Sequence, residues 1–190
     1  MPTIITHGLV AVALGKSFAP GRASKYFSQQ RFWELSVLCS VLPDADVIAF
    51  RLGIPYEDML GHRGLSHSLA FALVLSLLVV FVAFPRVPQG WSRFLMIVYF
   101  FVVTASHGVL DAMTDGGLGI AFFAPFDDTR YFFPFQPIQV SPLGRNFFSA
   151  RGLDVIVSEL LWVWLPVTAF TGAMILVRKL RRPHSHRNDG

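Results

Sequence analysis

Histidine and aspartate recur at several places in the first two thirds of the chain, each time beside an apolar stretch. Imidazole and carboxylate groups are ligands for Zn²⁺, Mn²⁺ or Fe in hydrolytic sites. An ionised carboxylate inside a hydrocarbon layer costs a few kcal/mol, and a bound cation would offset that cost. The residues that could supply this chemistry are His7, Asp44, Asp46, His62, His67, His107, Asp111 and Asp115.

The stretch that contains His107 predicts two ligands on one face of a helix. His107 and Asp111 are four residues apart, which is the spacing of neighbours on a helix surface. Asp115 would extend this face only if the helix continued, and Gly116-Gly117 indicates that it ends nearby. We therefore expect His107 and Asp111 to act together.

Four further candidates lie near the ends of predicted spans. Pro43 forces a turn that can project Asp44 and Asp46 in different directions. His62 and His67 are five residues apart, so they do not share one helical face and we expect different roles for them. The spacing leaves open whether Asp44 or Asp46, and whether His62 or His67, is the direct ligand.

The composition places these residues in a membrane protein. Of the 190 residues, 53% are hydrophobic and only 15% are charged, and the mean hydropathy is +0.53. Soluble domains contain roughly 25% charged residues, so this chain has too few polar residues to cover itself in water. This argues against a soluble enzyme, and also against a nucleic-acid partner despite a net charge of +4. The single cysteine, Cys39, excludes a four-cysteine zinc site and an internal disulfide.

We expect an all-α, polytopic membrane helical bundle with about four spans and a short N-terminal helix. One domain would cover residues 1–182, with 112–152 as an extramembrane or interfacial loop and 183–190 as a disordered tail. Thr3–Gly15 is about half a span and predicts a tucked or re-entrant helix. The predicted spans are Phe32–Phe50, interrupted at Pro43, then Leu65–Phe84, Trp91–Leu110 and Leu153–Val177, which either bends at Pro166 or tolerates it.

The basic residues predict the orientation of the bundle. Eleven of the 16 Lys and Arg residues fall in three groups, at 16–31, 86–93 and 178–187, which the expected spans place on one side. An excess of Lys and Arg marks the cytoplasmic side, so we expect a bacterial inner-membrane protein with a cytoplasmic C-terminus. The His and Asp candidates then meet at the opposite, periplasmic face. Unrelated polar residues would be scattered over both faces, so this convergence predicts a metal site at one membrane face.

Considered singly, several polar and aromatic residues also have structural explanations. His7 could be a hydrogen-bond partner between helices, and His107 and Asp111 could be a buried pair that stabilises the bundle. Glu159 lies within the last predicted span and requires a partner, for which Arg or His would serve. The Phe residues of 122–135 could pack at the interface, or form a loop that enters the lipid and receives an acyl chain.

Four short motifs follow one another in this region: Thr6-His7-Gly8, Leu42-Pro43-Asp44-Ala45-Asp46, Gly61-His62-Arg63-Gly64-Leu65-Ser66-His67-Ser68, and His107-Gly108-Val109-Leu110-Asp111. Together they resemble the YdjM-like family of inner-membrane, metal-dependent hydrolases. That family is similar in turn to the zinc-dependent phospholipase C and single-strand nuclease superfamily, a helical fold with clustered metals. The resemblance implies a ligand set of His7, Asp44 or Asp46, His62 or His67, His107 and Asp111.

The resemblance and the topology together predict hydrolysis of a phosphoester of a lipid or lipid-linked substrate at the periplasmic face. We expect one or two divalent ions, Zn²⁺ first and Mn²⁺ or Fe as alternatives, because a further His and acid set of the superfamily has no match here. Such an ion activates water near neutral pH and neutralises charge on phosphoryl oxygens. Arg63 would bind a phosphate group bidentately. The expected metal ligands are His7, Asp46, His62, His107 and Asp111. The expected catalytic residues are Asp44, His67 and Arg63.

Functions from two other classes are alternatives. A metal or proton transporter would hold its ion ligands near the bilayer midplane, whereas these candidates lie at span ends. A non-enzymatic structural or stress-related membrane protein would pair its polar groups with one another and have neither metal nor open cleft. The sequence favours the hydrolase over both and leaves the oligomeric state open.

Overall fold

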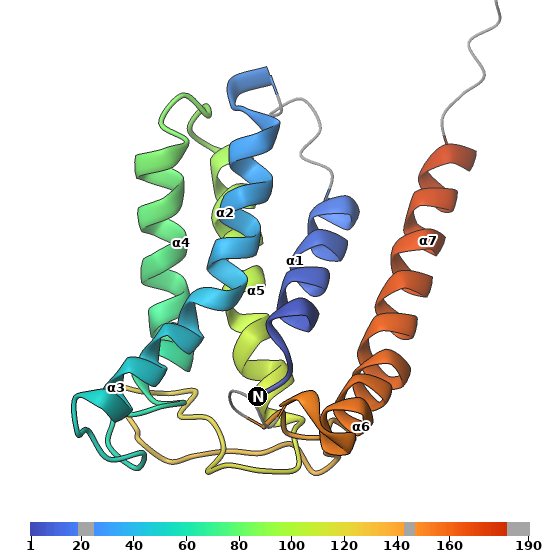
Figure 1. Ribbon diagram of the computed structural model, residues 1–190. Helices are drawn as coiled ribbons and strands as arrows, with labels where there is room; N and C mark the ends of the chain where they lie inside the picture. Colours follow the sequence, from blue (N-terminus) through green and yellow to red (C-terminus); the bar gives the residue numbers. More distant parts are fainter. Residues whose placement is uncertain (19–24, 143–146, 182–190) are drawn as a thin grey trace, which may run out of the picture.

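The apolar segments form helices that alternate in direction along one axis (Figure 1). The computed structural model describes residues 1–18, 25–142 and 147–181. The all-α prediction is confirmed for this part of the chain, which has two isolated β-bridges and no strand. The predicted tail, 183–190, lies outside it. The helices are α1 (Ile4–Phe18), α2 (Gln29–Val41), α3 (Ile48–Arg51), α4 (Leu69–Ala83), α5 (Trp91–Ala112), α6 (Ala150–Glu159) and α7 (Leu165–Leu180), with 3₁₀ turns at Leu42–Val47 and Leu65–His67 and a π-helical turn at Leu160–Trp164.

The helices α1, α2, α4 and α5 stand side by side, and α7 lies beyond α1 (Figure 1). In that view α1 runs upward, α2 downward, α4 upward, α5 downward, and α6 and α7 upward. The start of α1, the end of α2, the start of α4 and the end of α5 therefore lie together, at what we call the lower end of the bundle. Several of the basic residues assigned to the cytoplasmic side lie at helix ends or in the connection at the opposite, upper end: Lys16, Arg31, Arg86, Arg93 and Arg178.

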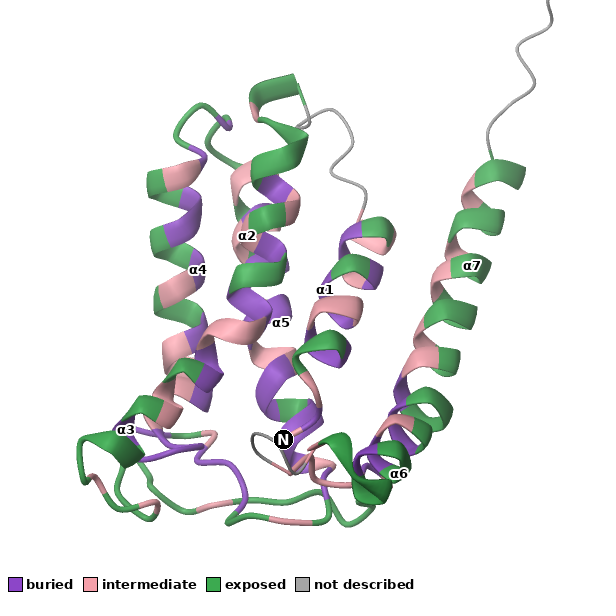
Figure 2. Ribbon diagram, viewed as in Figure 1, coloured by how far each residue is buried: buried purple, intermediate pink, exposed green. Residues whose placement is uncertain are grey.

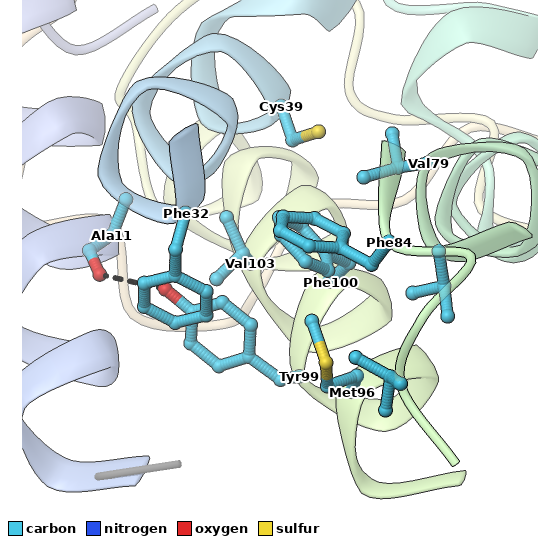
Figure 3. Packing of buried hydrophobic residues seen from close by; sticks show 11 residues of the cluster. Ala11, Phe32, Cys39, Val79, Phe84, Met96, Tyr99, Phe100 and Val103 are labelled. Atoms are coloured by element: carbon cyan, nitrogen blue, oxygen red, sulfur yellow. Dashed lines mark hydrogen bonds between the residues drawn. The ribbon is translucent and has the colours of Figure 1, made fainter. Parts of the chain in front are cut away.

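An aromatic core joins α2, α4 and α5 in the upper half of the bundle (Figure 3). Phe32 and Phe100 are fully buried, and the ring of Tyr99 stacks on Phe32 with centroids 4.9 Å apart. The Tyr99 hydroxyl donates to Ser36 Oγ at 2.8 Å, so its polar atom is satisfied inside the core. Burial of these rings supplies a large hydrophobic stabilisation and aligns the helices that reach the lower end.

Two continuous helices are long and apolar enough to cross a membrane among the described residues: α5, with 22 residues, and Ala150–Leu180, with 31. The helices α1 and α4 are apolar but have 15 residues each. At 1.5 Å per residue such a helix is only about 22 Å long, against roughly 30 Å of hydrocarbon. Of the roughly four spans that the sequence predicted, two are therefore long enough to cross a membrane.

Local sequence signals explain why the other predicted spans are shorter. The expected span Phe32–Phe50 ends as an α-helix at Val41, because Pro43 lies in the 3₁₀ turn that follows. The expected span Leu65–Phe84 becomes α-helical only at Leu69. Ser68 is the N-cap of α4, where its side chain accepts a hydrogen bond from the Phe71 amide.

The last helix is continuous through Pro166 because a π-helical turn precedes it. Proline lacks an amide hydrogen and its ring crowds the carbonyl four residues earlier, and the wider turn relieves both problems. No residue of α7 is buried, as its green and pink ribbon in Figure 2 shows. This exposed apolar helix is nevertheless tied to α1 at its top, where Arg178 donates to the Lys16 carbonyl at 2.8 Å.

At the lower end, the last helix contacts α1 through Glu159, which is fully buried. Its carboxylate accepts from the hydroxyls of Thr3 and Thr6, both at 2.6 Å, and from the Thr3 amide. The sequence predicted Arg or His as the partner of Glu159, and this was wrong. Hydroxyls and the free amide at a helix N-terminus satisfy a carboxylate equally well.

The connection between α5 and α6 crosses the lower end of the bundle and packs against it (Figure 1). Its Ile120 and Ile138 are fully buried, and backbone hydrogen bonds tie Phe122 O to the Leu69 amide and the Phe133 amide to Ala112 O. This segment, predicted as an interfacial loop at 112–152, therefore encloses the helix ends, while Phe126 remains 90% exposed.

Candidate metal centre

The lower end of the bundle brings together the His and Asp residues that the sequence singled out. His7 lies in the first half of α1, and His107 and Asp111 lie in the last turns of α5. The two aspartates after Pro43 lie in the 3₁₀ turn that ends α2, and His67 lies in the one before α4. The predicted convergence on one end of the molecule is thus present in the fold.

Four side chains form a compact cluster, which we call the first group: Asp44, His67, His107 and Asp111. Each offers one ligand atom within 4.8 Å of the others. His107 Nε2 lies 3.1 Å from His67 Nε2 and 3.2 Å from Asp44 Oδ1, and His67 Nε2 lies 3.6 Å from Asp111 Oδ2. Ligand atoms about 2.05 Å from one tetrahedral zinc ion lie about 3.3 Å apart, so the spacing suits a single divalent cation.

Backbone geometry allows this close approach between α5 and the segment before α4. A Cβ atom at Gly108 would lie 2.9 Å from the His67 carbonyl oxygen, so a larger residue would push the two segments apart. His107 Nδ1 contacts the carbonyl of Ser40 at 2.7 Å, and a proton on Nδ1 leaves the Nε2 lone pair facing the cluster. Metal-binding histidines are commonly oriented in this way.

Several buried polar atoms at the cluster have no hydrogen-bond partner among the described residues. Both carboxylate oxygens of Asp44, Asp111 Oδ1 and both ring nitrogens of His7 are in this condition. Buried polar groups without partners are rare and costly, because they lose water and gain nothing in exchange. A cation among these atoms would supply the missing interactions, so the donor set fits a metal ion.

His7 stands beside the first group. Its ring stacks on that of His107 with centroids 3.8 Å apart, and its Nε2 lies 3.7 Å from Asp111 Oδ1. The predicted ligand His7 is therefore adjacent to the cluster, on the side where the Asp111 oxygen lacks a hydrogen bond.

Asp46, His62 and His67 form a second group with ligand-like spacing. Asp46 Oδ1 lies 2.6 Å from His62 Nδ1, and Oδ2 lies 3.1 Å from His67 Nδ1. Oδ2 also accepts from the Ser66 hydroxyl and from the Arg63 amide. Both Asp46 oxygens are thus satisfied without a cation, and His67 joins the two groups through its two ring nitrogens.

Charge coupling in this region favours a protonated or metal-bound His67. Burial acts to lower the pKa of His67, but its contacts with Asp44 and Asp46 outweigh burial and raise it to about 9. Burial acts to raise the pKa of Asp44 and of Asp46, and the facing histidines hold both below their usual range. The carboxylates therefore remain ionised and attract positive charge.

Arg63 is nearly fully buried and is committed to contacts within the protein. Its Nε donates to Asp111 Oδ2 at 3.0 Å, Nη1 to the Gly116 carbonyl at 2.7 Å and Nη2 to the Thr114 hydroxyl at 3.0 Å. The sequence predicted that Arg63 binds a phosphate group. In the structure its Nε atom instead pairs with Asp111, a candidate metal ligand. No sequence signal joined these two residues, which are 48 positions apart.

A pocket of about 170 Å³ opens beside the second group. Its walls include His62, Arg63, Tyr56 and Gly117. The sequence analysis did not identify Tyr56 or Gly117 as site residues. Arg130, also overlooked, donates to the carbonyls of Tyr56 and His62 at 2.9 and 3.1 Å and so holds the rim of this pocket. Asp115 is not in the cluster, because α5 ends at Ala112, close to the helix end that Gly116-Gly117 predicted.

Comparisons with known proteins agree with the membrane assignment. A family model described as "YdjM inner membrane protein" matches residues 1–181. A curated relative, "Inner membrane protein YbcI" of Escherichia coli (strain K12), is 38% identical over 178 residues, which cover 92% of this chain and 97% of that protein. No solved structure matches the chain.

Proposed function

The chain belongs to the YdjM inner membrane protein family, and from this starting point we propose that it is a membrane-bound, metal-dependent hydrolase that cleaves a phosphoester of a lipid or lipid-linked substrate. The observation that carries the proposal is the first group, in which four buried ligand atoms from three segments face one another. Two of these residues, Asp44 and Asp111, have buried carboxylate oxygens without hydrogen bonds. Buried carboxylate oxygens without hydrogen bonds destabilise a fold, and a bound cation would remove that cost.

Asp44, His67, His107 and Asp111 would hold a divalent cation, which we take to be Zn²⁺ on the basis of its nitrogen and oxygen donors. Such an ion activates water for attack on phosphorus and stabilises charge on the phosphoryl oxygens. His62 and Asp46 would support this ion or hold a second one.

The surrounding residues prepare the ligands for this role. The Ser40 carbonyl accepts the proton on His107 Nδ1, and Asp46 attracts the proton on His67 Nδ1, so both rings would bind the cation through Nε2, His67 after it loses its second proton. Arg63 donates to Asp111 Oδ2, the oxygen that faces His67, and Asp111 Oδ1 faces His7 without a hydrogen bond, so both oxygens adjoin the candidate cation site. The pocket beside His62 would admit the phosphoryl group of the substrate.

We propose that the lower end faces the periplasm and that the C-terminus is cytoplasmic, because most of the basic residues belong to the upper end. In this arrangement α2 and α4 cross the membrane with α5 and the last helix, since they stand alongside α5 and point along the same axis. The candidate ligands then lie near one membrane surface, which fits a hydrolase better than a transporter with a midplane site.

The non-enzymatic alternative draws its support from the second group. There, Asp46 is satisfied by His62, Ser66 and the Arg63 amide without a metal. The first group is less completely paired: Arg63 donates to Asp111 Oδ2, but Asp111 Oδ1 and both Asp44 oxygens have no hydrogen bond among the described residues. For this reason we place the hydrolase first.

Metal content and hydrolysis together test the proposal. The protein is purified in a mild detergent, its bound metal is measured, and release of phosphate or headgroup is followed for a panel of phosphoesters. His107→Ala and Asp111→Ala should each lose the metal and the activity. Asp128→Asn, at an exposed carboxylate away from the cluster, is the control and should keep both. Full metal occupancy in both alanine variants would contradict the proposal.

A further inference from the structure

Two pockets at the lower end of the bundle share a wall. The pocket beside the second group has Met1 and Ser141 among its lining residues. A larger pocket, of about 330 Å³, is lined by the same two residues on its other side, together with Ile4, Ile5 and Phe148. A hydrogen bond from Ser141 N to the Met1 carbonyl, at 3.0 Å, joins these two shared residues. The two pockets are therefore neighbours, and a molecule that occupied both would cross Met1 and Ser141.

The larger pocket is apolar, and nothing in the described part of the chain covers it. Ile4 is 66% exposed, Ile5 is 61% exposed and Phe148 is 89% exposed. Such a patch is stabilised when hydrocarbon replaces water over it. Ile4 and Ile5 lie one helical turn or less before His7, which corresponds to about 3–5 Å along the axis of α1. The apolar surface therefore begins next to the candidate metal ligands.

We propose that this apolar pocket is the subsite for the hydrocarbon chain of an amphiphilic phosphoester whose phosphoryl group occupies the smaller pocket beside His62. The inference rests on the proposed function and narrows its substrate class to single phosphoesters attached directly to an apolar chain. Positive charge lies closer to the pocket beside His62, because Arg63 is in its lining and Arg130 donates to the His62 carbonyl, while the larger pocket has no charged side chain in its lining. The Arg63 guanidinium is engaged with Asp111, Thr114 and Gly116, so it supplies charge rather than a free donor.

A second apolar groove is an alternative place for a hydrocarbon chain. It has a volume of about 420 Å³ and is lined by residues of α4, α5 and the 122–126 segment, including Leu73, Phe101 and Phe126. It shares no lining residue with the pocket beside His62. A chain in this groove would not be continuous with a phosphoryl group beside His62, so the inference places the chain against Ile4 and Ile5 instead.

Photolabelling of the metal-loaded protein in lipid nanodiscs tests the assignment. The probe is an alkyl phosphate with a photoreactive diazirine near the end of its chain, and the labelled residues are identified by mass spectrometry. We expect labels on Ile4, Ile5, Phe147 or Phe148, and we expect unlabelled alkyl phosphate to compete. The alkanol of the same chain length should not compete, because it lacks the phosphoryl group.

Two matched variants replace an exposed aliphatic residue with tryptophan, one in each apolar pocket. Ile5→Trp should lower the labelling yield about tenfold, a loss equivalent to contact with about two methylene groups. Leu73→Trp, in the second groove, should leave the yield unchanged. Labels that concentrate on Leu73 and Phe126, or that the alkanol competes away equally, would overturn the inference.

The same preparations separate this inference from the hydrolase proposal. If the alkyl phosphate labels the Ile4–Ile5 pocket but no phosphoester is hydrolysed, the subsite stands and the hydrolase proposal fails. If phosphoesters are hydrolysed in a metal-dependent way but the labels lie elsewhere, the hydrolase proposal stands and the subsite fails.

Discussion

The Nε2 atoms of His67 and His107 lie 3.1 Å apart in the buried interior, close enough that two neutral rings would present lone pairs to each other. The Nδ1 atoms of both rings already face oxygen acceptors, His107 at Ser40 O and His67 at Asp46 Oδ2. Positive charge between the two Nε2 atoms, as a proton or a metal ion, removes this repulsion. The relationship between these two histidines supports our proposal that the cluster holds a cation.

Asp46 should act on the metal through His67. Asp46→Asn keeps the size of the side chain but removes the carboxylate that faces His67 Nδ1. We expect the affinity for Zn²⁺ to fall about 10- to 100-fold, the usual effect of losing such a supporting carboxylate. Titration of the metal-free protein with Zn²⁺ measures the effect, with Asp128→Asn as the control. An unchanged affinity would mean that Asp46 does not orient His67.

Metal binding should become tighter as the pH rises. The pKa of His67, raised to about 9 in the metal-free protein, means that an incoming ion must displace a proton from this ring below that pH. The apparent association constant should therefore rise by up to about tenfold per pH unit from about pH 6 to about pH 8. Calorimetry in buffers of different ionisation enthalpy would count the released protons. An affinity independent of pH would contradict the protonated state of His67.

The metal-free fold should respond to pH in the opposite direction. A histidine with a raised pKa contributes stability that is fully present below about pH 6.5 and is lost as the pH rises through about 9. Added Zn²⁺ should remove this dependence, because the ion replaces the proton. Thermal unfolding with and without Zn²⁺ across this range checks the sign.

Arg63 should stabilise the metal-free protein more than the metal-bound protein. Arg63→Met removes the guanidinium that pairs with Asp111 Oδ2 and leaves a buried carboxylate without its partner. Breaking one side of a buried ion pair costs about 3–5 kcal/mol. We expect a lower melting temperature without metal and a larger increase on adding Zn²⁺ than in the wild-type protein. Equal increases in both proteins would show that Asp111 does not contact the ion.

Gly117 should control the size of the pocket beside His62. Its φ of +93° favours glycine, and a Cβ there would lie 2.4 Å from Arg63 Nη1 and 2.7 Å from the Tyr56 hydroxyl. Gly117→Ala should destabilise the fold by about 1–3 kcal/mol and reduce phosphoester hydrolysis. Gly172→Ala, in an open position on α7, is the matched control and should be neutral or slightly stabilising. Activity and melting temperature unaffected by Gly117→Ala would exclude the pocket as the substrate site.

Glu159 should hold the last helix to α1 without taking part in metal binding. Glu159→Gln keeps one acceptor oxygen but loses the charge that strengthens the bonds from Thr3 and Thr6. We expect a loss of about 1.5–3 kcal/mol in unfolding free energy, the range for hydrogen bonds to charged groups, with bound metal unchanged. A variant that loses metal at an unchanged melting temperature would assign Glu159 to the centre instead.

The amino-acid sequence by itself determined the membrane class, the helical fold and the meeting of His and Asp residues at one end. These properties are local or additive: hydropathy predicts the apolar helices, and their alternating direction decides which helix ends meet. His107 and Asp111 could be paired from sequence because a four-residue spacing on a helix brings side chains together wherever the helix lies.

Only the tertiary structure decided which partners those residues have. It placed Asp44 with His107, and Asp46 with His62, because the backbone of the 3₁₀ turn after Pro43 points the two carboxylates apart. It also paired Arg63 with Asp111 and Glu159 with Thr3. Contacts between residues so distant in the chain depend on how whole helices pack and on side-chain rotamers at their ends, and no local pattern in the sequence encodes either.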